Sequence, residues 1–562
     1  MSNMEYRIRY RQWLDYEALE PDLRAELEAI KDNETEIRER FCQDLTFGTA
    51  GLRGLMGAGT NRMNVYTVQR ATAGLGLYLL TTHGKEAMQR GVVIAYDNRA
   101  NSELFAQEAA LTLNSLGIRT YVFDRLAPTP ELSFAVKYRQ SIAGIVITAS
   151  HNPKEYNGYK VYNEHGCQIT GEMAEAILEK IDIYQELAAL PVLMSVENAR
   201  SRDLYHEIGN AYHQVFQKAV LEQALLQDSA AKENLKIVYT PLHGTGLGSV
   251  TSVLDKDGFT QVHVLESQKE PDTQFSTVHS PNPEDKEALQ LAIACAQEIN
   301  ADLVLGTDPD CDRVGIAVRD GDQFVLLTGN QTGALLADYV LSHKILDDKS
   351  VVIKTIVTSE LGADIASAYG AEVMNVLTGF KYIGEKMTGF EQNRDHTFVM
   401  GYEESYGYLV GSHAKDKDAV VASMLICEMA AYQKAQGKNL LQRLEELYQQ
   451  YGYYKDTVDS FTLPGADGQE RIADIMTELR AEQASEIGGL AVAEVKDYAN
   501  GIDGLPKANV LKYFFADGGW MAVRPSGTEP KIKFYYSVKG ETMKAAEEKV
   551  AALQEAAKKI VA

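Results

Sequence analysis

The chain has 562 residues, enough for about three to five domains of ordinary size. Its 55 basic and 79 acidic residues give a formal net charge of -24 at pH 7. That balance argues against a general nucleic-acid binder, because such proteins attract phosphate backbones with a positive surface. The N-terminal residues are too polar for a secretory signal, and no stretch carries the roughly 18 apolar residues that span a bilayer. We therefore expect a cytoplasmic protein with no nucleic-acid or membrane partner.

Short apolar strands that run directly into loops rich in Gly, Pro or Asp recur along the chain. They are predicted within 92–99, 142–153, 235–246 and 301–313. Helices are predicted between them, at 102–117 and 283–299. Uninterrupted apolar strands are typical of parallel sheets buried on both faces, and strands that alternate with helices predict βαβ units. Such units are predicted around 92–150, 235–316 and 351–410.

The C-terminal part of the sequence has a different pattern. Strand-like segments near 461–465, 520–527 and 531–538 accompany a helix near 469–484, which indicates a smaller α+β domain. We therefore predict four domains, the first with an N-terminal helical extension. Their ranges are 1–205, 206–325, 326–450 and 451–562.

The first loop of interest, 148–153, follows the apolar strand that ends near Ile147. In open parallel sheets ligands bind beyond the carboxyl ends of strands, so Ser150 is a candidate nucleophile if a base or a cation activates it. The loop is not a hydrolase nucleophile elbow, because Thr148 and Asn152 stand where that motif needs glycines. An ordinary Ser-His-Asn-Pro turn remains the alternative.

The second loop carries three carboxylates at alternate positions, Asp308, Asp310 and Asp312. An all-oxygen set with few protein ligands favours magnesium beside a phosphate group. A calcium EF-hand is excluded, because Arg313 and Arg319 stand where its glycine and glutamate belong. A solvated acidic turn is the alternative, but it explains poorly why like charges crowd between two apolar strands. The adjacent Arg313 can neutralise a phosphoryl oxygen.

Two further loops offer groups that bind sugars and phosphates. Residues 401–407, GYEESYG, combine carboxylates and a serine that suit vicinal hydroxyls, although a charged surface hairpin would look similar. Residues 524–530, RPSGTEP, combine Arg524, two hydroxyls and a glycine, a set that predicts an anion nest suited to a phosphate dianion. This segment is not a P-loop, because no lysine follows Gly527, and a plain turn with a surface arginine is the alternative.

Together the four loops suit a substrate that is phosphorylated at one end and reacts at the other. In this order they resemble the α-D-phosphohexomutase superfamily, which includes phosphoglucomutases and phosphomannomutases. The matching segments are FGTAGLRG, TASHNP, DPDCDR, EESYG and RPSGTEP. The resemblance implies four domains around a central cleft: three related α/β domains with mixed, mostly parallel sheets, and a smaller C-terminal α+β domain.

The resemblance also implies roles for individual residues. Ser150 would carry a phosphate and complete a site for one magnesium ion with Asp308, Asp310 and Asp312. Catalytic positions of the family fall on Arg53, Lys160, Arg313 and Lys381, and His151 is a candidate for proton transfer, with the general base left open. Substrate contacts are implied for Glu403 and Ser405, which would bind sugar hydroxyls, and for Arg524, Ser526, Gly527 and Thr528, which would bind the non-reacting phosphate.

The implied activity is phosphoglucomutase: interconversion of glucose 1-phosphate and glucose 6-phosphate through phosphoserine, with glucose 1,6-bisphosphate as intermediate and activator. The sequence EES at 403–405 resembles the corresponding segment of glucose-specific members, whereas the mannose-tolerant branch has methionine where Glu404 stands. The longer branch, with an N-terminal extension like residues 1–46, includes enzymes that prefer phosphopentoses, so ribose or deoxyribose 1-phosphate stays open. A sugar phosphatase and an inactive sugar-phosphate sensor are the alternatives of other classes. Monomer and dimer are both open.

Overall fold

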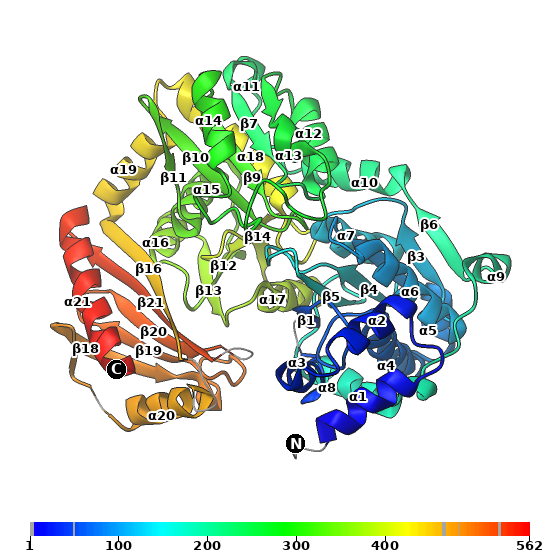
Figure 1. Ribbon diagram of the computed structural model, residues 1–562. Coiled ribbons are helices and arrows are strands. Elements are labelled where there is room, and N and C mark those ends of the chain that lie inside the picture. Colours follow the sequence, from blue (N-terminus) through cyan, green and yellow to red (C-terminus); the bar gives the residue numbers. More distant parts are fainter. Residues whose placement is uncertain (1–4, 49–50, 464–467, 483, 527–529) are drawn as a thin grey trace. The chain divides into compact units, whose positions relative to one another are not determined.

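The computed structural model describes residues 5–48, 51–463, 468–482, 484–526 and 530–562 (Figure 1). The chain divides into two compact units. Unit 1 comprises Met1–Leu326, Ile383–Gln392 and Gly407–Tyr432. Unit 2 comprises Leu327–Tyr382, Asn393–Tyr406 and Gln433–Ala562.

Unit 1 begins with three helices, in the part of the chain where a helical extension was predicted. They are α1 (Glu5–Asp15), α2 (Pro21–Ala29) and α3 (Glu34–Phe41). Proline at the first position suits the start of α2, and Asn33 caps α3 by accepting a hydrogen bond from the Glu36 N–H. The helices bury Trp13, Leu27 and Phe41 in one apolar cluster with Tyr66, so the extension packs onto the first α/β domain.

The first sheet is mixed and has the strand order β1-β5-β4-β2-β3-β6. Its strands are β1 (Leu52–Leu55), β2 (Val92–Tyr96), β3 (Thr120–Phe123), β4 (Ala143–Ile147), β5 (Tyr156–Asn163) and β6 (Tyr205–Ile208). Strands β4, β2, β3 and β6 are parallel, whereas β1 and β5 are antiparallel to their neighbours. The helices of this part are α4 (Val65–His83), α5 (Lys85–Arg90), α6 (Ser102–Ser115), α7 (Thr129–Arg139), α8 (Gly171–Ile181) and α9 (Val196–Ser201).

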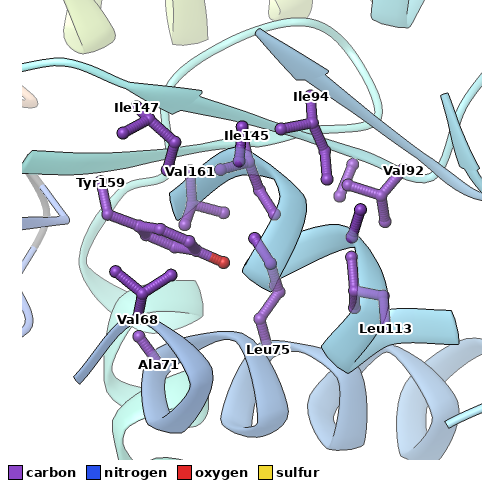
Figure 2. Close-up of a cluster of buried hydrophobic side chains, with 14 of the residues drawn as sticks. Val68, Ala71, Leu75, Val92, Ile94, Leu113, Ile145, Ile147, Tyr159 and Val161 are labelled. Atoms are coloured by element: carbon purple, nitrogen blue, oxygen red, sulfur yellow. The ribbon is translucent and has the colours of Figure 1, made fainter. Parts of the chain in front are cut away.

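Both faces of this sheet are buried, as the apolar strands predicted. Alternate residues of each strand point to opposite faces. One face packs on α4 and α6, and Figure 2 shows it with the side chains of Val92, Ile94, Ile145, Ile147, Tyr159 and Val161 from the sheet, Val68, Ala71 and Leu75 from α4, and Leu113 from α6. On the other face Val93 and Ala95 pack with Leu132 and Val136 of α7. The loops at the strand ends are therefore held by a rigid double-sided core.

The second sheet of unit 1 has the order β11-β10-β9-β7-β8. Its strands are β7 (Ile237–Thr240), β8 (Val262–Val264), β9 (Leu303–Thr307), β10 (Val314–Asp320) and β11 (Gln323–Leu326). Strands β8, β7 and β9 are parallel, and β10 returns antiparallel to β9, so residues 308–313 form the turn of a hairpin. The helices are α10 (Asn210–Leu221), α11 (Ser229–Asn234), α12 (Gly246–Asp257), α13 (Glu266–Lys269) and α14 (Gln290–Glu298).

The helix predicted at 283–299 begins later than expected, at Gln290. The preceding residues form successive turns instead. The Asn282 side chain accepts a hydrogen bond from the Glu284 N–H, and the Asn282 carbonyl accepts one from the Asp285 N–H. Asparagine competes with helix formation through such local bonds, which explains the shorter helix.

The third α/β segment contains a parallel sheet in unit 2, ordered β13-β12-β14. The strands are β12 (Ser350–Thr355), β13 (Glu372–Val376) and β14 (Thr397–Tyr402), with helices α15 (Gly329–His343), α16 (Leu361–Ala368) and α19 (Leu440–Tyr451). The remaining elements of the segment are β15 (Tyr408–Val410), α17 (Phe380–Asn393) and α18 (Ala419–Ala435). Strand β15 and most of the two helices belong to unit 1.

The C-terminal part of unit 2 has a fully antiparallel sheet, ordered β16-β21-β20-β19-β18-β17. The strands are β16 (Tyr453–Thr462), β17 (Glu486–Ile487), β18 (Leu490–Asp497), β19 (Leu511–Phe515), β20 (Trp520–Pro525) and β21 (Lys531–Gly540). Helices α20 (Gly468–Ala481) and α21 (Met543–Val561) pack on it through an apolar cluster that includes Ile475, Phe534 and Leu553. This is the distinct α+β domain that the sequence predicted.

The fold class is confirmed, with three α/β segments whose sheets are mixed or parallel and a different C-terminal domain. The domain boundaries at 205, 325 and 450 and the central cleft stay predictions. Within the described ranges, no helix is both long and apolar enough to cross a membrane.

Unit 2 buries a small ionic cluster around Lys512 of β19. The Lys512 Nζ donates to the Ile356 carbonyl (2.7 Å) and lies 3.7 Å from the Glu360 carboxylate. Lys354 (3.0 Å) and the Trp520 indole (3.0 Å) contact the same carboxylate. Burial lowers the pKa of Lys512 to about 7, and the positive charge of Lys354 acts in the same direction.

This shift predicts a pH-dependent stability that Lys512→Met removes. Between pH about 7 and the ordinary lysine value of 10.5, the unfolded chain holds a proton at Lys512 that the folded chain has lost. Because the unfolded state binds more protons in that window, the folded state gains stability as the pH rises. The melting temperature of the native protein should therefore rise by several degrees relative to that of Lys512→Met between about pH 7 and about pH 9.5.

The exposed Lys533 of β21 provides the control. Lys533→Met should differ from the native protein by the same amount at both pH values. A pH-independent difference for Lys512→Met would contradict the buried, weakly basic lysine.

Candidate functional site

Ser150 lies three residues beyond the end of β4 and is almost fully buried. Its backbone adopts a left-handed conformation with φ of 52°. Its N–H donates to the Thr148 hydroxyl (2.8 Å), which holds the turn. The Ser150 Oγ donates to Asp308 Oδ2 (2.8 Å), a residue 158 positions later, and lies 3.2 Å from His151 Nδ1. The fold therefore brings the predicted nucleophile loop and the predicted carboxylate loop into direct contact.

The three aspartates lie in the turn between β9 and β10. Asp308 Oδ1 accepts the backbone N–H groups of Asp312 and Arg313 (3.0 Å each), which curls the loop around its own first carboxylate. Asp308, Asp310 and Asp312 are each no more than 1% exposed, and each offers one oxygen within 4.8 Å of the other two. The alternate spacing thus converges three buried carboxylates on one point.

Two lysines compensate part of this negative charge. Lys160 of β5 contacts Asp310 (2.7 Å) and Asp312 (3.2 Å), and Lys417 contacts Asp312 (3.1 Å). Burial and the neighbouring carboxylates raise the pKa of Asp308 well above its usual range. Burial would also raise the pKa values of Asp310 and Asp312, but the lysines lower both below that range. We call Ser150, the three aspartates and the two lysines the carboxylate cage.

The carboxylate cage fits a metal ion. Asp310 Oδ1 and Asp312 Oδ1 are buried, yet neither accepts a hydrogen bond from any residue that the structure describes. A buried carboxylate oxygen without a partner is costly, and a cation among the three carboxylates removes that cost. The all-oxygen donor set is one that hard divalent cations prefer.

Three other predicted residues surround Ser150. The exposed Arg53 donates to the Asn152 side chain (2.9 Å), in the loop that carries Ser150. Arg313 forms an ion pair with Glu284 (2.6 Å) and lies 3.9 Å from Asp312. Burial, reinforced by Arg313 and Arg53, lowers the pKa of His151 well below its usual value, so its imidazole is neutral at pH 7.

Sequence reasoning missed Lys417 and Thr129. The Thr129 hydroxyl donates to Asp310 Oδ2 (2.9 Å), and its N–H donates to the Asp310 carbonyl (2.8 Å). Thr129 begins α7 after the β3 loop, so the strand-end rule applied to β3 would have found it. Lys417 stands in a charged stretch before α18, and no motif or spacing in the sequence connects it with Asp312.

The remaining predicted residues lie in unit 2. Lys381, at the start of α17, has its Nζ 5.1 Å from the centre of the Tyr382 ring. Glu403 is buried and Ser405 is half-buried, directly after β14. Arg524 lies near the end of β20 and Ser526 follows that strand directly, and the Ser526 N–H donates to the Lys531 carbonyl (2.7 Å). Gly527 and Thr528 lie outside the described residues.

Tyr535 connects the predicted sugar loop with Arg524. Burial raises the pKa of Tyr535 to about 12, and the charges of Glu404 and Glu403 add to the shift while Arg524 opposes it. The Glu404 carboxylate also accepts hydrogen bonds from Thr355 (3.2 Å) and Thr358 (3.3 Å) at the end of β12. Carboxylates and an arginine thus gather around one tyrosine within unit 2.

The carboxylate loop packs closely against Gly244, a position that leaves no space for a larger side chain. The α-carbon of Gly244, before α12, faces Pro309 so closely that a β-carbon would lie 2.4 Å from the Pro309 Cα. We expect Gly244→Ala to displace the loop, to lower the free energy of unfolding by about 1–3 kcal/mol and to weaken the binding of a divalent metal ion, measured by calorimetric titration. Gly248→Ala is the matched control, since a β-carbon there meets nothing within 4 Å. If Gly244→Ala and Gly248→Ala had the same metal affinity and the same melting temperature, the tight contact between Gly244 and Pro309 would be contradicted.

Comparisons with known proteins cover most of the chain. Four domain models of phosphoglucomutase/phosphomannomutase match: α/β/α domain I at residues 44–188, domain II at 214–321, domain III at 328–451 and the C-terminal domain at 471–556. The phosphoglucomutase of Staphylococcus aureus strain MRSA252 is 38% identical over 527 residues, which cover 91% of this chain and 92% of that protein.

Solved structures share the fold at lower identity. A phosphoglucomutase/phosphomannomutase family protein of Burkholderia thailandensis is 18% identical with a TM-score of 0.69, covering 92% of this chain and 96% of that one. The open form of a Paramecium phosphoglucomutase, parafusin, is 17% identical with a TM-score of 0.67, covering 92% and 94%.

Proposed function

This chain belongs to the phosphoglucomutase/phosphomannomutase family, and we propose that it is an isomerase that interconverts α-D-glucose 1-phosphate and glucose 6-phosphate. The observation that carries the proposal is the hydrogen bond from the Ser150 hydroxyl to Asp308 inside a cage that also holds two lysines. A phosphate carrier needs a hydroxyl beside groups that neutralise phosphoryl charge, and here a cation held by the three carboxylates, together with the two lysines, would do so. The 38% identity to a phosphoglucomutase over most of both chains supports glucose as the sugar.

In the proposed reaction Ser150 carries the phosphoryl group between the two ends of the sugar. The bond from phosphorus to Ser150 Oγ breaks as a sugar hydroxyl attacks, the hydroxyl proton passes to a base, and glucose 1,6-bisphosphate forms. After the intermediate turns over, its other phosphate returns to Ser150 Oγ. Phosphoryl transfer depends on positioning and charge neutralisation, which the buried Ser150 loop and a cation held by the carboxylate cage would provide.

The residues of the carboxylate cage and its neighbours would each neutralise or position a different charge in the reaction. Asp308, Asp310, Asp312 and the phosphate on Ser150 would hold one magnesium ion, whose chemistry is to neutralise charge on the transferring group. Lys160 and Lys417 fix two of the carboxylates, and Arg53 and Arg313 offer planar donors at the edge of the Ser150 loop. The neutral His151 imidazole, 3.2 Å from Ser150 Oγ, is positioned to exchange a proton with that oxygen.

The unit 2 loops would recognise the rest of the substrate. Glu403 and Ser405 offer acceptors for sugar hydroxyls, and Lys381 offers a further cation. Arg524, Ser526, Gly527 and Thr528 would bind the phosphate that does not react. The clustering of Glu403, Glu404 and Arg524 around Tyr535 supports a common substrate surface in this unit.

The experiment that tests the function compares kcat/KM for glucose 1-phosphate, mannose 1-phosphate and ribose 1-phosphate, with free phosphate measured in parallel. We expect glucose 1-phosphate to be converted fastest, without release of phosphate. A preference for ribose or mannose 1-phosphate would replace the sugar in the proposal with a pentose or mannose. Release of phosphate would identify a phosphatase, and no reaction with any of the three a sensor. The cytoplasmic location and the choice between monomer and dimer stay predictions.

A further inference from the structure

We infer that Arg99 is a positioning residue for Ser150, because its buried guanidinium sets the backbone of the loop from Ser150 to Tyr156. The inference rests on the proposed function only for its kinetic test. Arg99 follows β2, a neighbour of β4 in the first sheet, and the guanidinium has no measurable exposure. It contacts the loop entirely through backbone oxygens, so it acts on the shape of the loop and not on a ligand.

The contacts use both terminal nitrogens of the guanidinium. One donates to the carbonyls of Ser150 and Asn152 (2.5 Å each). The other donates to the carbonyls of Pro153 (2.9 Å) and Tyr156 (3.2 Å). One rigid, planar group thus fixes four carbonyls across seven consecutive residues. Lysine has a single nitrogen and cannot reproduce this fork.

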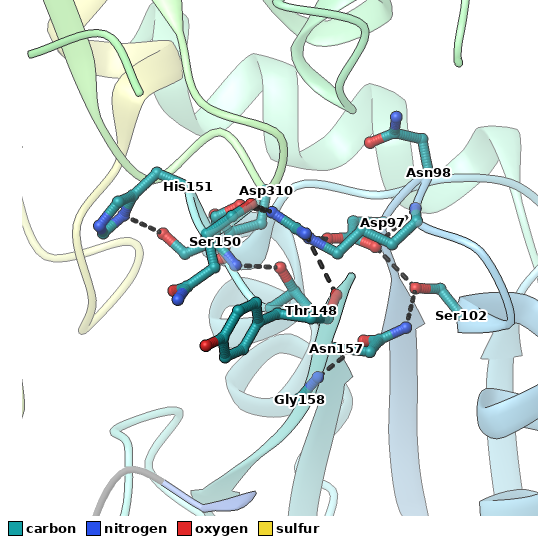
Figure 3. Close-up of polar contacts among 12 residues, drawn as sticks. Asp97, Asn98, Ser102, Thr148, Ser150, His151, Asn157, Gly158 and Asp310 are labelled. Atoms are coloured by element: carbon teal, nitrogen blue, oxygen red, sulfur yellow. Dashed lines mark hydrogen bonds and ion pairs between the residues drawn. The ribbon is translucent and has the colours of Figure 1, made fainter. Parts of the chain in front are cut away.

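Asp97 holds Arg99 in place from the other side. Its carboxylate lies 3.3 Å from the Arg99 Nε, accepts the Arg99 backbone N–H (3.0 Å) and accepts the Ser102 hydroxyl (2.7 Å). Ser102 in turn accepts the Asn157 side chain (3.0 Å), whose oxygen accepts the Gly158 N–H (2.7 Å). Figure 3 shows this chain of contacts from Asp97 through Ser102 and Asn157 to Gly158, with Ser150 alongside.

The loop needs such support because Ser150 is in an uncommon conformation. A non-glycine residue with φ of 52° carries local backbone strain, which persists only when surrounding contacts over-determine the backbone. Arg99 supplies that determination, since it holds the carbonyl of Ser150 itself. Without the guanidinium, the Ser150 hydroxyl would spend part of the time in positions where it cannot form its hydrogen bond with Asp308.

The kinetic test uses Arg99→Lys, with Arg40→Lys as the matched control. Arg40 is a mostly buried arginine of α3 that binds Glu26, Glu36 and the Ala58 carbonyl, away from the Ser150 loop. We expect kcat of Arg99→Lys to fall by about 100-fold with KM within about threefold of the native value, because a misplaced nucleophile slows transfer and leaves sugar binding intact. Arg40→Lys should lose thermal stability without this kcat loss. A kcat within about twofold of native, or equal losses in both variants, would overturn the inference.

Hydrogen exchange tests the same inference without any activity. Amides of residues 148–158 should exchange at least about tenfold faster in Arg99→Lys than in the native protein, while those of β9 stay unchanged. Unchanged exchange in residues 148–158 would overturn the inference even if the mutase activity is established. If the native protein converts no sugar phosphate, the proposed function fails and exchange alone decides the role of Arg99.

A third variant covers the case in which Arg99→Lys does not fold. Ser102→Ala removes one hydrogen bond to Asp97 and one from Asn157 while Arg99 stays in place. It should lower kcat by about tenfold at unchanged KM and speed exchange in residues 148–158. Native kcat together with native exchange in Ser102→Ala would overturn the inference.

Discussion

Ser150→Ala is expected to lower kcat by on the order of 10⁴-fold or more, because it removes the hydroxyl proposed to carry the phosphoryl group. Ser150 Oγ is the only atom lost, and alanine meets the same backbone strain at φ of 52° as serine does. The variant should therefore fold, with a melting temperature within a few degrees of the native protein. Glucose 1-phosphate should still bind, since the groups proposed to bind the sugar and its other phosphate lie in unit 2.

Ser195→Ala is the control for this prediction. Ser195 caps α9 through its side chain and has no proposed part in the reaction, so its loss should affect stability alone. The assay needs protein free of contaminating mutase from the expression host. Native-like turnover of Ser150→Ala under those conditions would contradict a covalent role for this serine.

Asp310→Asn is expected to raise the magnesium concentration for half-maximal activity by at least about tenfold and to lower kcat by on the order of 10²-fold. The substitution keeps the shape of the side chain but removes one of three negative charges and leaves Lys160 with Asp312 alone. Both effects weaken the hold on a divalent cation. Magnesium titrations of activity, with binding measured separately by calorimetry, distinguish the loss of affinity from the loss of rate.

The control for the magnesium titration is Asp302→Asn. Asp302 precedes β9, and its carboxylate accepts the Lys236 N–H (2.8 Å), so it lies in the same domain with a structural role. Its magnesium titration should match that of the native protein. If the magnesium titration of Asp310→Asn matched that of the native protein, the assignment of the carboxylate cage as the metal site would be contradicted.

The fold was largely predictable because its strands are apolar without interruption. The runs at 92–99 and 142–153 bury both faces of β2 and β4, so hydrophobic pattern and length determine them. The late start of α14 was not predictable from apolar spacing, because Asn282 turns the chain through its own backbone bonds. Such local competition between side chain and helix has no periodic signal.

For the site, too, the residues that stand in sequence motifs could be predicted, and those that matter only through tertiary contacts could not. Ser150 and the three aspartates stand in motifs at strand ends, and the expectation that the two loops cooperate agrees with the contact between Ser150 and Asp308. Lys417 and Arg99 were missed because their importance lies in tertiary contacts. A lysine before a helix and an arginine after a strand are ordinary in sequence, and only the folded chain brings them to Asp312 and to the Ser150 carbonyl.

The covalent role of Ser150 is tested most directly by following the phosphate itself. The native protein is incubated with glucose 1,6-bisphosphate that carries radioactive phosphate, digested and sequenced by mass spectrometry, and a second sample is chased with unlabelled glucose 1-phosphate. We predict that the label lies on Ser150 and moves to glucose phosphates within the time of one turnover. Label on another residue, or label on Ser150 that leaves only as inorganic phosphate, would contradict it.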